Sequence, residues 1–248
     1  MRGCGRYHNH WIIVKQVGRA ALYGVARLSV FMKTVRILGA ARNAREFTEP
    51  VPPGVEVWLS NNPTTTLLRC KKAINYWTRW FNLHSKAWIL GVYPSAWHYY
   101  GNKALGRPVY LLKAQEDIPT SIAFPRGAIQ TYFATAKGPN RYFTCSVAWL
   151  LAFAIMEGFE RIELWGFELR DKPTGAYMWE RPCVAYWMQV ARDAGIDVWY
   201  QPEIERLYEA GKMMPGNPDT YNDKLYGYST KPEPDWCLVH EEFGCCQA

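Results

Sequence analysis

The feature that most constrains the fold of this chain is the alternation of short apolar runs with longer amphipathic stretches between about residues 35 and 200. A short apolar run suits a strand buried on both faces, and a longer amphipathic stretch suits a helix that packs on the sheet. Repetition of this pair predicts helices on both faces of a mainly parallel sheet. We therefore expect an α/β fold, a Rossmann-like three-layer sandwich with about six strands.

The predicted elements follow from these runs and from the glycines and prolines between them. Strands are predicted over residues 35–38, 55–59, 80–83, 109–112, 161–166 and 196–200. Helices are predicted over residues 65–77, 144–157 and 182–194, with a helical or irregular stretch around residues 88–97. Residues 113–141 contain three prolines. We expect a loop with a short helix there, where an active-site lid would lie.

Charge separates the start of the chain from the rest. The net charge is +7, but residues 1–31 hold five basic and no acidic residues, which leaves 24 basic against 22 acidic, or +2. We expect residues 1–31 to be an extension that precedes the folded domain. We favour an optional extension, with translation starting at Met32, and the alternative is an Arg-rich targeting peptide. Residues 32–205 are predicted to form a nucleotide-binding domain, and residues 206–248 a polar appendage. Because residues 32–248 together carry a net charge of only +2, nucleic acid is a possible partner but not a favoured one.

Hydropathy and cysteine usage exclude further classes of protein. The longest uncharged apolar stretch, residues 142–156, is shorter than the roughly 20 residues that cross a bilayer, so it predicts a buried helix and no membrane partner. The seven cysteines form no C-x-x-C pair. Their odd number without a secretion signal predicts reduced thiols, a cytoplasmic protein and no zinc site.

Candidate functional residues follow the predicted strands, because the carboxyl ends of parallel strands and the N-termini of the next helices meet at one edge of the sheet. The residues in question are Gly39, Arg42, Asn43, Ser60, Asn61, Asn62, His84, Gly166 and Glu168. Gly39 is equally consistent with a phosphate-binding turn and a plain turn, because the full G-x-G-x-x-G pattern is absent. Asn61 and Asn62 suit either a turn or carboxamides that bind a base or ribose.

Two of these residues are catalytic candidates, and two further groups are candidates for phosphate binding. His84 is the first choice, because imidazole exchanges protons near neutral pH, and Glu168 suits a metal ion or a sugar hydroxyl. Thr144 and Ser146 either cap a helix or bind phosphate at its N-terminus. The second group consists of Tyr177, Glu180 and Arg181. It offers an aromatic ring for stacking and an Arg that can bind phosphate, or else only a Glu-Arg ion pair at the surface.

Short ordered motifs carry a resemblance to known proteins over roughly residues 33–202. They are Gly39-Ala40, Val57-Trp58-Leu59-Ser60-Asn61-Asn62, Arg79-Trp80-Phe81-Asn82-Leu83-His84, Tyr142-Phe143-Thr144-Cys145-Ser146, Gly158-Phe159 with Ile162-Glu163-Leu164-Trp165-Gly166-Phe167, and Tyr177-x-x-Glu180-Arg181-Pro182. With these the chain resembles small proteins, often encoded by bacteriophages, that are similar to the 6-hydroxymethylpterin diphosphokinase-like and motility-accessory-factor family. More distantly, it resembles bacterial sialyltransferases that use CMP-sugars.

The resemblance implies a transferase that uses a nucleotide-activated donor, in the host cytoplasm if the protein is phage-encoded. One possibility is ATP with Mg²⁺ near Gly39 and Thr144, with Glu168 as a metal ligand. The other is a nucleotide-sugar, with His84 assisting the leaving phosphate or the acceptor. The chain departs from the family at residues 41–43, where further glycine and a Pro-Ser pair are usual. Other classes stay open: a non-catalytic nucleotide- or signal-binding accessory protein, or a phage enzyme that modifies nucleic acid.

Overall fold

Seven strands form a single parallel sheet in the order β5-β4-β3-β2-β1-β6-β7. The structure is a computed structural model that describes residues 32–47, 50–61, 76–103, 106–136, 138–169 and 177–218. Its strands are β1 (Thr34–Leu38), β2 (Glu56–Ser60), β3 (Arg79–Asn82), β4 (Val109–Leu111), β5 (Ser121–Ala123), β6 (Arg161–Trp165) and β7 (Asp197–Tyr200). Its helices are η1 (Arg42–Glu46), α2 (Lys86–Val92), α3 (Pro94–Lys103), α4 (Arg126–Tyr132), α5 (Ser146–Met156), α6 (Tyr177–Asp193) and α7 (Pro202–Glu209).

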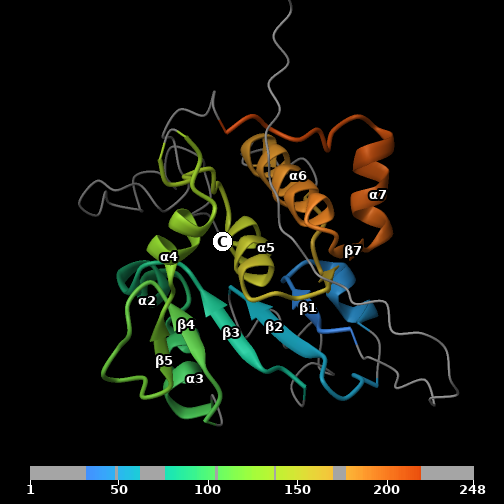
Figure 1. Cartoon of the computed structure of the whole chain (residues 1–248). Coiled ribbons are helices and arrows are strands. Elements are labelled where there is room, and N and C mark those ends of the chain that lie inside the picture. The colour runs from blue at the N-terminus through green and yellow to red at the C-terminus, as the bar shows by residue number, and fades with distance from the viewer. Residues whose placement is uncertain are drawn as a thin grey trace, which may run out of the picture. The chain divides into compact units, whose positions relative to one another are not determined.

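Alternating residues of the strands fill two cores on opposite faces of the sheet, which confirms the predicted three-layer α/β fold. Trp58 and Phe81 belong to the core that α4, α5, α6 and α7 cover. Val57 and Trp80, their neighbours in sequence, belong to the core that η1, α2 and α3 cover. Successive strand residues point to opposite faces, so each strand contributes to both cores. Figure 1 shows α5, α6 and α7 together on one side of the sheet.

The sequence-based prediction missed one strand and placed the start of one helix too late. The region 113–141 holds the expected short helix, α4, but also a seventh strand, β5, which pairs in parallel with β4. Helix α6 starts at Tyr177, five residues before the predicted start at Pro182, and encloses that proline. Proline favours the first turn of a helix but does not by itself mark its first residue. The predicted helix over residues 65–77 lies outside the described residues except for its last two, which are not helical.

The described residues after β7, 201–218, still pack on the domain. In α7, Ile204 and Leu207 are buried in the same core as α5 and α6, and Met213 is 1% exposed. The Gly216 N–H then donates to the Pro182 carbonyl at 2.9 Å, which brings this segment back onto α6. Packing therefore continues past residue 206, where we expected the appendage to start. No helix in the described ranges is long and apolar enough to cross a membrane.

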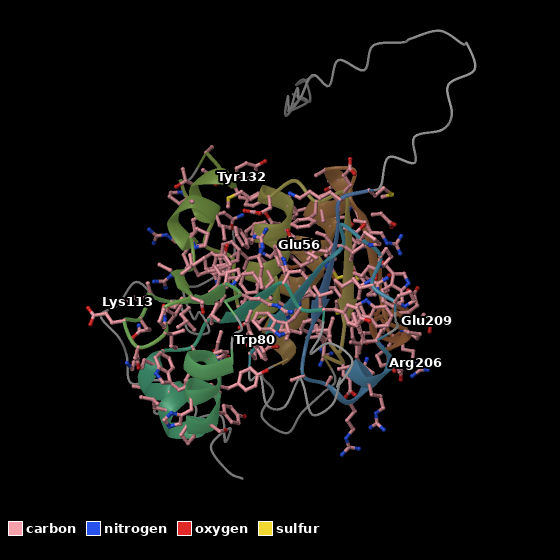
Figure 2. All side chains as sticks on the ribbon, turned by 90° about the horizontal axis from the view of Figure 1, so that it is seen from below. Glu56, Trp80, Lys113, Tyr132, Arg206 and Glu209 are labelled. Carbon is pink, nitrogen blue, oxygen red and sulfur yellow. The ribbon has the colours of Figure 1, made fainter. Side chains whose placement is uncertain are left out.

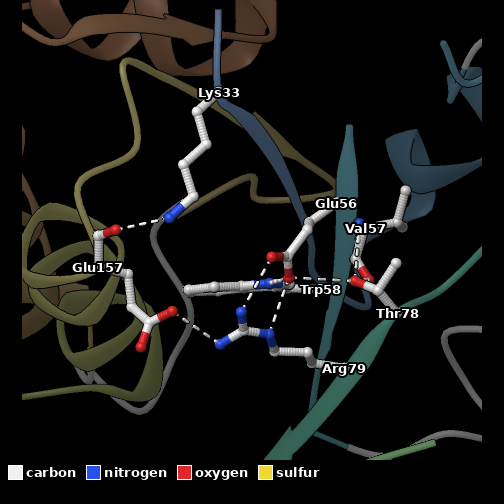
Figure 3. Close-up of polar contacts among 7 residues, drawn as sticks. All are labelled: Lys33, Glu56, Val57, Trp58, Thr78, Arg79 and Glu157. Carbon is white, nitrogen blue, oxygen red and sulfur yellow. Dashed lines mark hydrogen bonds and ion pairs between the residues drawn. The ribbon is translucent and has the colours of Figure 1, made fainter. Parts of the chain in front are cut away.

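An ion-pair network fastens the amino edge of the sheet around Arg79, the first residue of β3 (Figure 3). Its guanidinium forms two bonds to Glu56 of β2, at 2.8 and 2.9 Å, and one to Glu157 after α5, at 3.1 Å. It also lies over the ring of Trp58 at 5.2 Å, and the Trp58 Nε1 donates to Glu56 at 2.8 Å. Burial acts to lower the pKa of Arg79, but the charge and hydrogen bond of Glu56, together with the charges of Tyr110 and Glu157, raise the pKa overall. One side chain thus joins two strands and the end of α5.

We expect Arg79→Ala to lower the free energy of unfolding by about 1–3 kcal/mol, because it leaves two partly buried carboxylates, Glu56 and Glu157, without their shared cation. Urea denaturation followed by circular dichroism measures this difference. Arg206→Ala is the matched control, since Arg206 is an exposed arginine on α7 that lies at the periphery of the molecule in Figure 2. Equal stability of the two variants would contradict a structural role for Arg79.

Candidate functional site

The loops after β1 and β6 touch each other at the point where the strand order reverses. The Gly39 N–H donates to the Trp165 carbonyl at 2.7 Å, and the Ala41 N–H donates to the Gly166 carbonyl at 3.0 Å. A Cβ added to Gly39 would lie 2.4 Å from the Gly166 oxygen and 2.7 Å from the Phe167 ring. Gly166 has φ 72° and room for no side chain either. Both glycines therefore have a packing requirement, beside whatever they contribute to ligand binding.

Polar groups fasten this pair of loops from η1 and α7. Asn43 is 5% exposed, and its Nδ2 donates to Glu203 of α7 at 3.0 Å. Its Oδ1 has no hydrogen-bond partner among the described residues. Gln201, which the sequence analysis missed, accepts from the Gly166 N–H at 2.7 Å. Arg42, at the start of η1, is exposed, so its guanidinium lies at the surface beside the first loop.

Asn61 occupies a strained but well-anchored position after β2. Its φ is 62°, in the left-handed region that favours glycine and asparagine. Its carbonyl accepts from the Trp80 Nε1 and from the Tyr100 hydroxyl, both at 3.0 Å. Tyr100 in turn accepts from the Asn82 Nδ2 at 3.1 Å. Two buried aromatic donors therefore fix the backbone that presents the Asn61 carboxamide, and its Oδ1 is buried without a partner among the described residues.

Ser60 and His84 are buried beside this anchored turn. The Ser60 Oγ donates to the Leu38 carbonyl at 3.1 Å, which connects the end of β2 to the end of β1. The His84 ring is 8% exposed and stacks on Trp88 of α2, with centroids 3.8 Å apart. Its backbone N–H donates to the Asn82 Oδ1 at 3.3 Å. The stacking fixes the plane of the imidazole at the carboxyl end of β3.

The N-terminus of α5 packs against α6 at Cys183, and its helix cap differs from the prediction. Cys145, rather than Thr144 or Ser146, occupies the N-cap position of α5, and its side chain makes no capping hydrogen bond. The Thr144 N–H donates to the Cys183 Sγ of α6 at 3.4 Å. Thr144 and Ser146 are both buried. Thr144 and Ser146 therefore lie where the N-terminus of α5, with its N–H groups and positive dipole end, meets α6.

The two thiols at this junction are not nucleophiles at neutral pH. Burial raises the pKa of Cys183 to about 12, with the nearby charge of Glu180 acting in the same direction. Burial also raises the pKa of Cys145 well above its usual value, again helped by Glu180. A protonated, buried thiol is unreactive. These two buried cysteines therefore pack between α5 and α6 and are not candidate nucleophiles.

The remaining predicted residues divide between this junction and the loop after β6. Arg181 is 6% exposed on the first turns of α6, and Glu180 is half-buried beside it. Tyr177 is the first residue of α6. Glu168 is half-buried and precedes Leu169, which has φ 46°. Asn62 lies outside the described residues, and the described ranges contain no group of three or more His, Cys, Asp or Glu side chains placed to bind a metal ion.

Comparison with known proteins yields structural neighbours only. No protein-family model matches the sequence, and no curated protein matches it closely enough to be significant. Among solved structures, the sialyltransferase CstII from Campylobacter jejuni in complex with cytidine-5'-monophosphate has a TM-score of 0.40 and 12% identity over 85% of this chain and 100% of that one. The same enzyme with CMP-3FNeuAc has a TM-score of 0.42 and 12% identity over 86% and 100%. Likeness at this level says nothing about which residues bind or react.

We expect Asn61→Gly to keep the stability of the protein within about 0.5 kcal/mol, because glycine adopts the left-handed conformation freely and the backbone carbonyl keeps both donors. Asn61→Ala should cost about 1 kcal/mol or more, since alanine pays the strain of the same conformation. Chemical denaturation of the two variants measures the difference. If alanine is tolerated as well as glycine, the left-handed turn is not required.

Proposed function

We propose that this protein is a transferase that binds a nucleotide-activated donor, a nucleotide-sugar, at the carboxyl edge of its parallel sheet. The observation that carries the proposal is the single reversal of strand order between β1 and β6. Open α/β sheets bind their ligands outside the carboxyl ends of the strands at such a reversal. Because the Gly39 and Gly166 loops are in contact there, the donor would lie against them and not between them.

The groups that follow β2 support recognition of a nucleoside. The Asn61 carboxamide is held by an anchored backbone and has a buried oxygen without a described partner. A carboxamide in a fixed orientation offers an acceptor and two donors to a base edge or to ribose hydroxyls. An unpaired buried acceptor costs free energy until a donor reaches it, so a ligand that supplies the donor gains affinity.

The junction of α5 and α6 supports recognition of the phosphate. Thr144 and Ser146 hydroxyls lie at the N-terminus of α5, and Arg181 is buried in the first turns of α6. Helix N-termini and a guanidinium both stabilise an anion, and the guanidinium can bind it with two hydrogen bonds. Glu180 beside them is suited to hold the guanidinium in place. Arg42 at the surface of η1 is a second cation for the donor's phosphate.

His84 and Glu168 are the proposed reacting groups. In transfer from a nucleotide-sugar, the bond from the anomeric carbon to the phosphate oxygen breaks, and the acceptor oxygen bonds to that carbon while losing its proton. His84, oriented by Trp88, is suited to take that proton or to give one to the leaving phosphate. Glu168 is suited to orient an acceptor hydroxyl. Both roles need the group to face the bound donor.

A thermal-shift panel tests the proposal on the full chain. We expect at least one of CMP, UDP, GDP or their sugar derivatives to raise the Tm by about 5 °C at concentrations far above its Kd. Asn61→Gly should lower that shift clearly without lowering the Tm of the free protein, while Arg206→Ala, the remote control, keeps it. No shift with any nucleotide would refute the proposal.

Adding ATP to the panel, with and without Mg²⁺, and assaying product formation separates the other functions. A shift with ATP that requires Mg²⁺, and none with nucleotide-sugars, would favour a diphosphokinase-like transferase. Tight binding without product formation, equally tight in His84→Gln and Glu168→Gln, would favour a binding protein without catalysis. In an enzyme these two variants should lose at least about 100-fold in turnover and keep most of their affinity.

A further inference from the structure

Gln201 is a polar residue at the carboxyl edge whose hydrogen bonds connect several segments that follow strands. It is the first residue after β7 and is 2% exposed. Its Oε1 accepts from the Gly166 N–H at 2.7 Å, and its Nε2 donates to the Asn43 carbonyl at 3.0 Å and to the Glu46 Oε2 at 3.1 Å. The side chain therefore connects the ends of β7 and β6 with η1, which follows β1.

The chemistry of these three bonds requires a carboxamide. The Gly166 N–H needs an acceptor, and the Asn43 carbonyl and the Glu46 carboxylate both need donors. Glutamine supplies one acceptor and two N–H donors on one planar group. Glutamate would present a second carboxylate to Glu46, and methionine would satisfy none of the three groups well. The Gly166 N–H and the Asn43 carbonyl are bonded in buried surroundings, where an unmade hydrogen bond is costly, whereas Glu46 is an exposed residue.

The backbone of Gln201 leaves little freedom for this group to move. Pro202 follows as the first residue of α7, and the Gln201 carbonyl accepts from the Ile204 N–H at 3.0 Å. On the other side, a Cβ at Gly166 would lie 2.8 Å from the Ala44 Cβ and from the Gly39 oxygen. The loops after β1 and β6 are thus packed without spare room and fastened from β7.

We infer that Gln201 is a positioning residue: it sets the placement of the Gly39 and Gly166 loops, so that nucleotide affinity depends on a side chain that does not touch the nucleotide. This inference rests on the proposed function for its effect on affinity. It rests on the three hydrogen bonds alone for its effect on the loops. The two effects can therefore be measured separately.

The affinity experiment is a double-mutant cycle on the full chain, with CMP, UDP, GDP and ADP as probes in isothermal titration calorimetry. Gln201→Glu should weaken binding by about tenfold or more, because two carboxylates then face each other and the Asn43 carbonyl loses its donor. Glu46→Gln alone should change Kd by less than about threefold, since its amide oxygen can still accept. The double variant should bind at least about threefold more tightly than Gln201→Glu, because the new amide at position 46 donates to the new carboxylate.

The loop experiment does not depend on any ligand. Hydrogen exchange of the Gly166 amide, followed by NMR, should speed up at least about tenfold in Gln201→Met, which lacks the acceptor. It should stay slow in Gln201→Glu, which keeps an oxygen there. A global loss of stability would instead speed up amides throughout the sheet in both variants.

The outcomes distinguish the two claims. If the wild-type protein binds no probe, the proposed function fails, and the Gly166 exchange rates alone decide the role of Gln201. If the wild-type protein binds but Gln201→Glu binds equally well, or the double variant shows no recovery, the inference about affinity is overturned. Unchanged Gly166 exchange in Gln201→Met overturns the placement of the loop by Gln201.

Discussion

Burial of α5 is the packing interaction on which the architecture depends. Every residue of this helix from Ser146 to Ile155 is buried, so it has no face to turn toward water. Phe153 packs on Trp58 of the sheet, and Trp149 stacks on Phe143, which stacks on Trp187 of α6. A helix apolar on nearly all sides needs a layer on each side of it. The sheet and α6 provide those layers, and their positions bring the N-terminus of α5 to the carboxyl edge, where Thr144 contacts Cys183 of α6.

The two edges of the sheet carry different kinds of polar group. At the amino edge, charged groups pair with one another, as Arg79 does with Glu56 and Glu157. At the carboxyl edge, the buried polar groups are mostly uncharged amides and hydroxyls held by backbone and aromatic donors. Arg181, which is buried near the start of α6, is a charged group among them. Ion pairs that satisfy each other give rigidity, whereas a fixed amide such as that of Asn61, whose Oδ1 has no partner among the described residues, suits a polar ligand.

The sequence predicted the order of elements well because parallel strands are continuous apolar runs with clear ends. It missed β5, since Ser121–Ala123 is only three residues long, partly exposed and close to prolines on both sides. It placed the start of α6 too late, because Pro182 was taken as the first turn. The network around Arg79 could not be predicted at all, since Glu56 and Glu157 are far from it in sequence and only the fold brings them together. Gln201 was within reach: it follows a strand, as Asn61 and Gly166 do, and the same rule applied to the last strand would have found it.

The contacts of Gly39 and Gln201 change what a glycine at the end of β1 means. A glycine there is usually taken as the place where a phosphate approaches the backbone, yet the space that its missing side chain leaves is filled by Gly166 and Phe167. A substitution at Gly39 would therefore displace the neighbouring loop first, and any loss of binding would follow from that displacement. Asn61 is different, because its φ of 62° is one that glycine adopts freely and its carboxamide oxygen has no partner among the described residues. If the edge binds a nucleotide as proposed, a change at Asn61 removes a contact of the edge itself, and a change at Gln201 disturbs the arrangement of the loops.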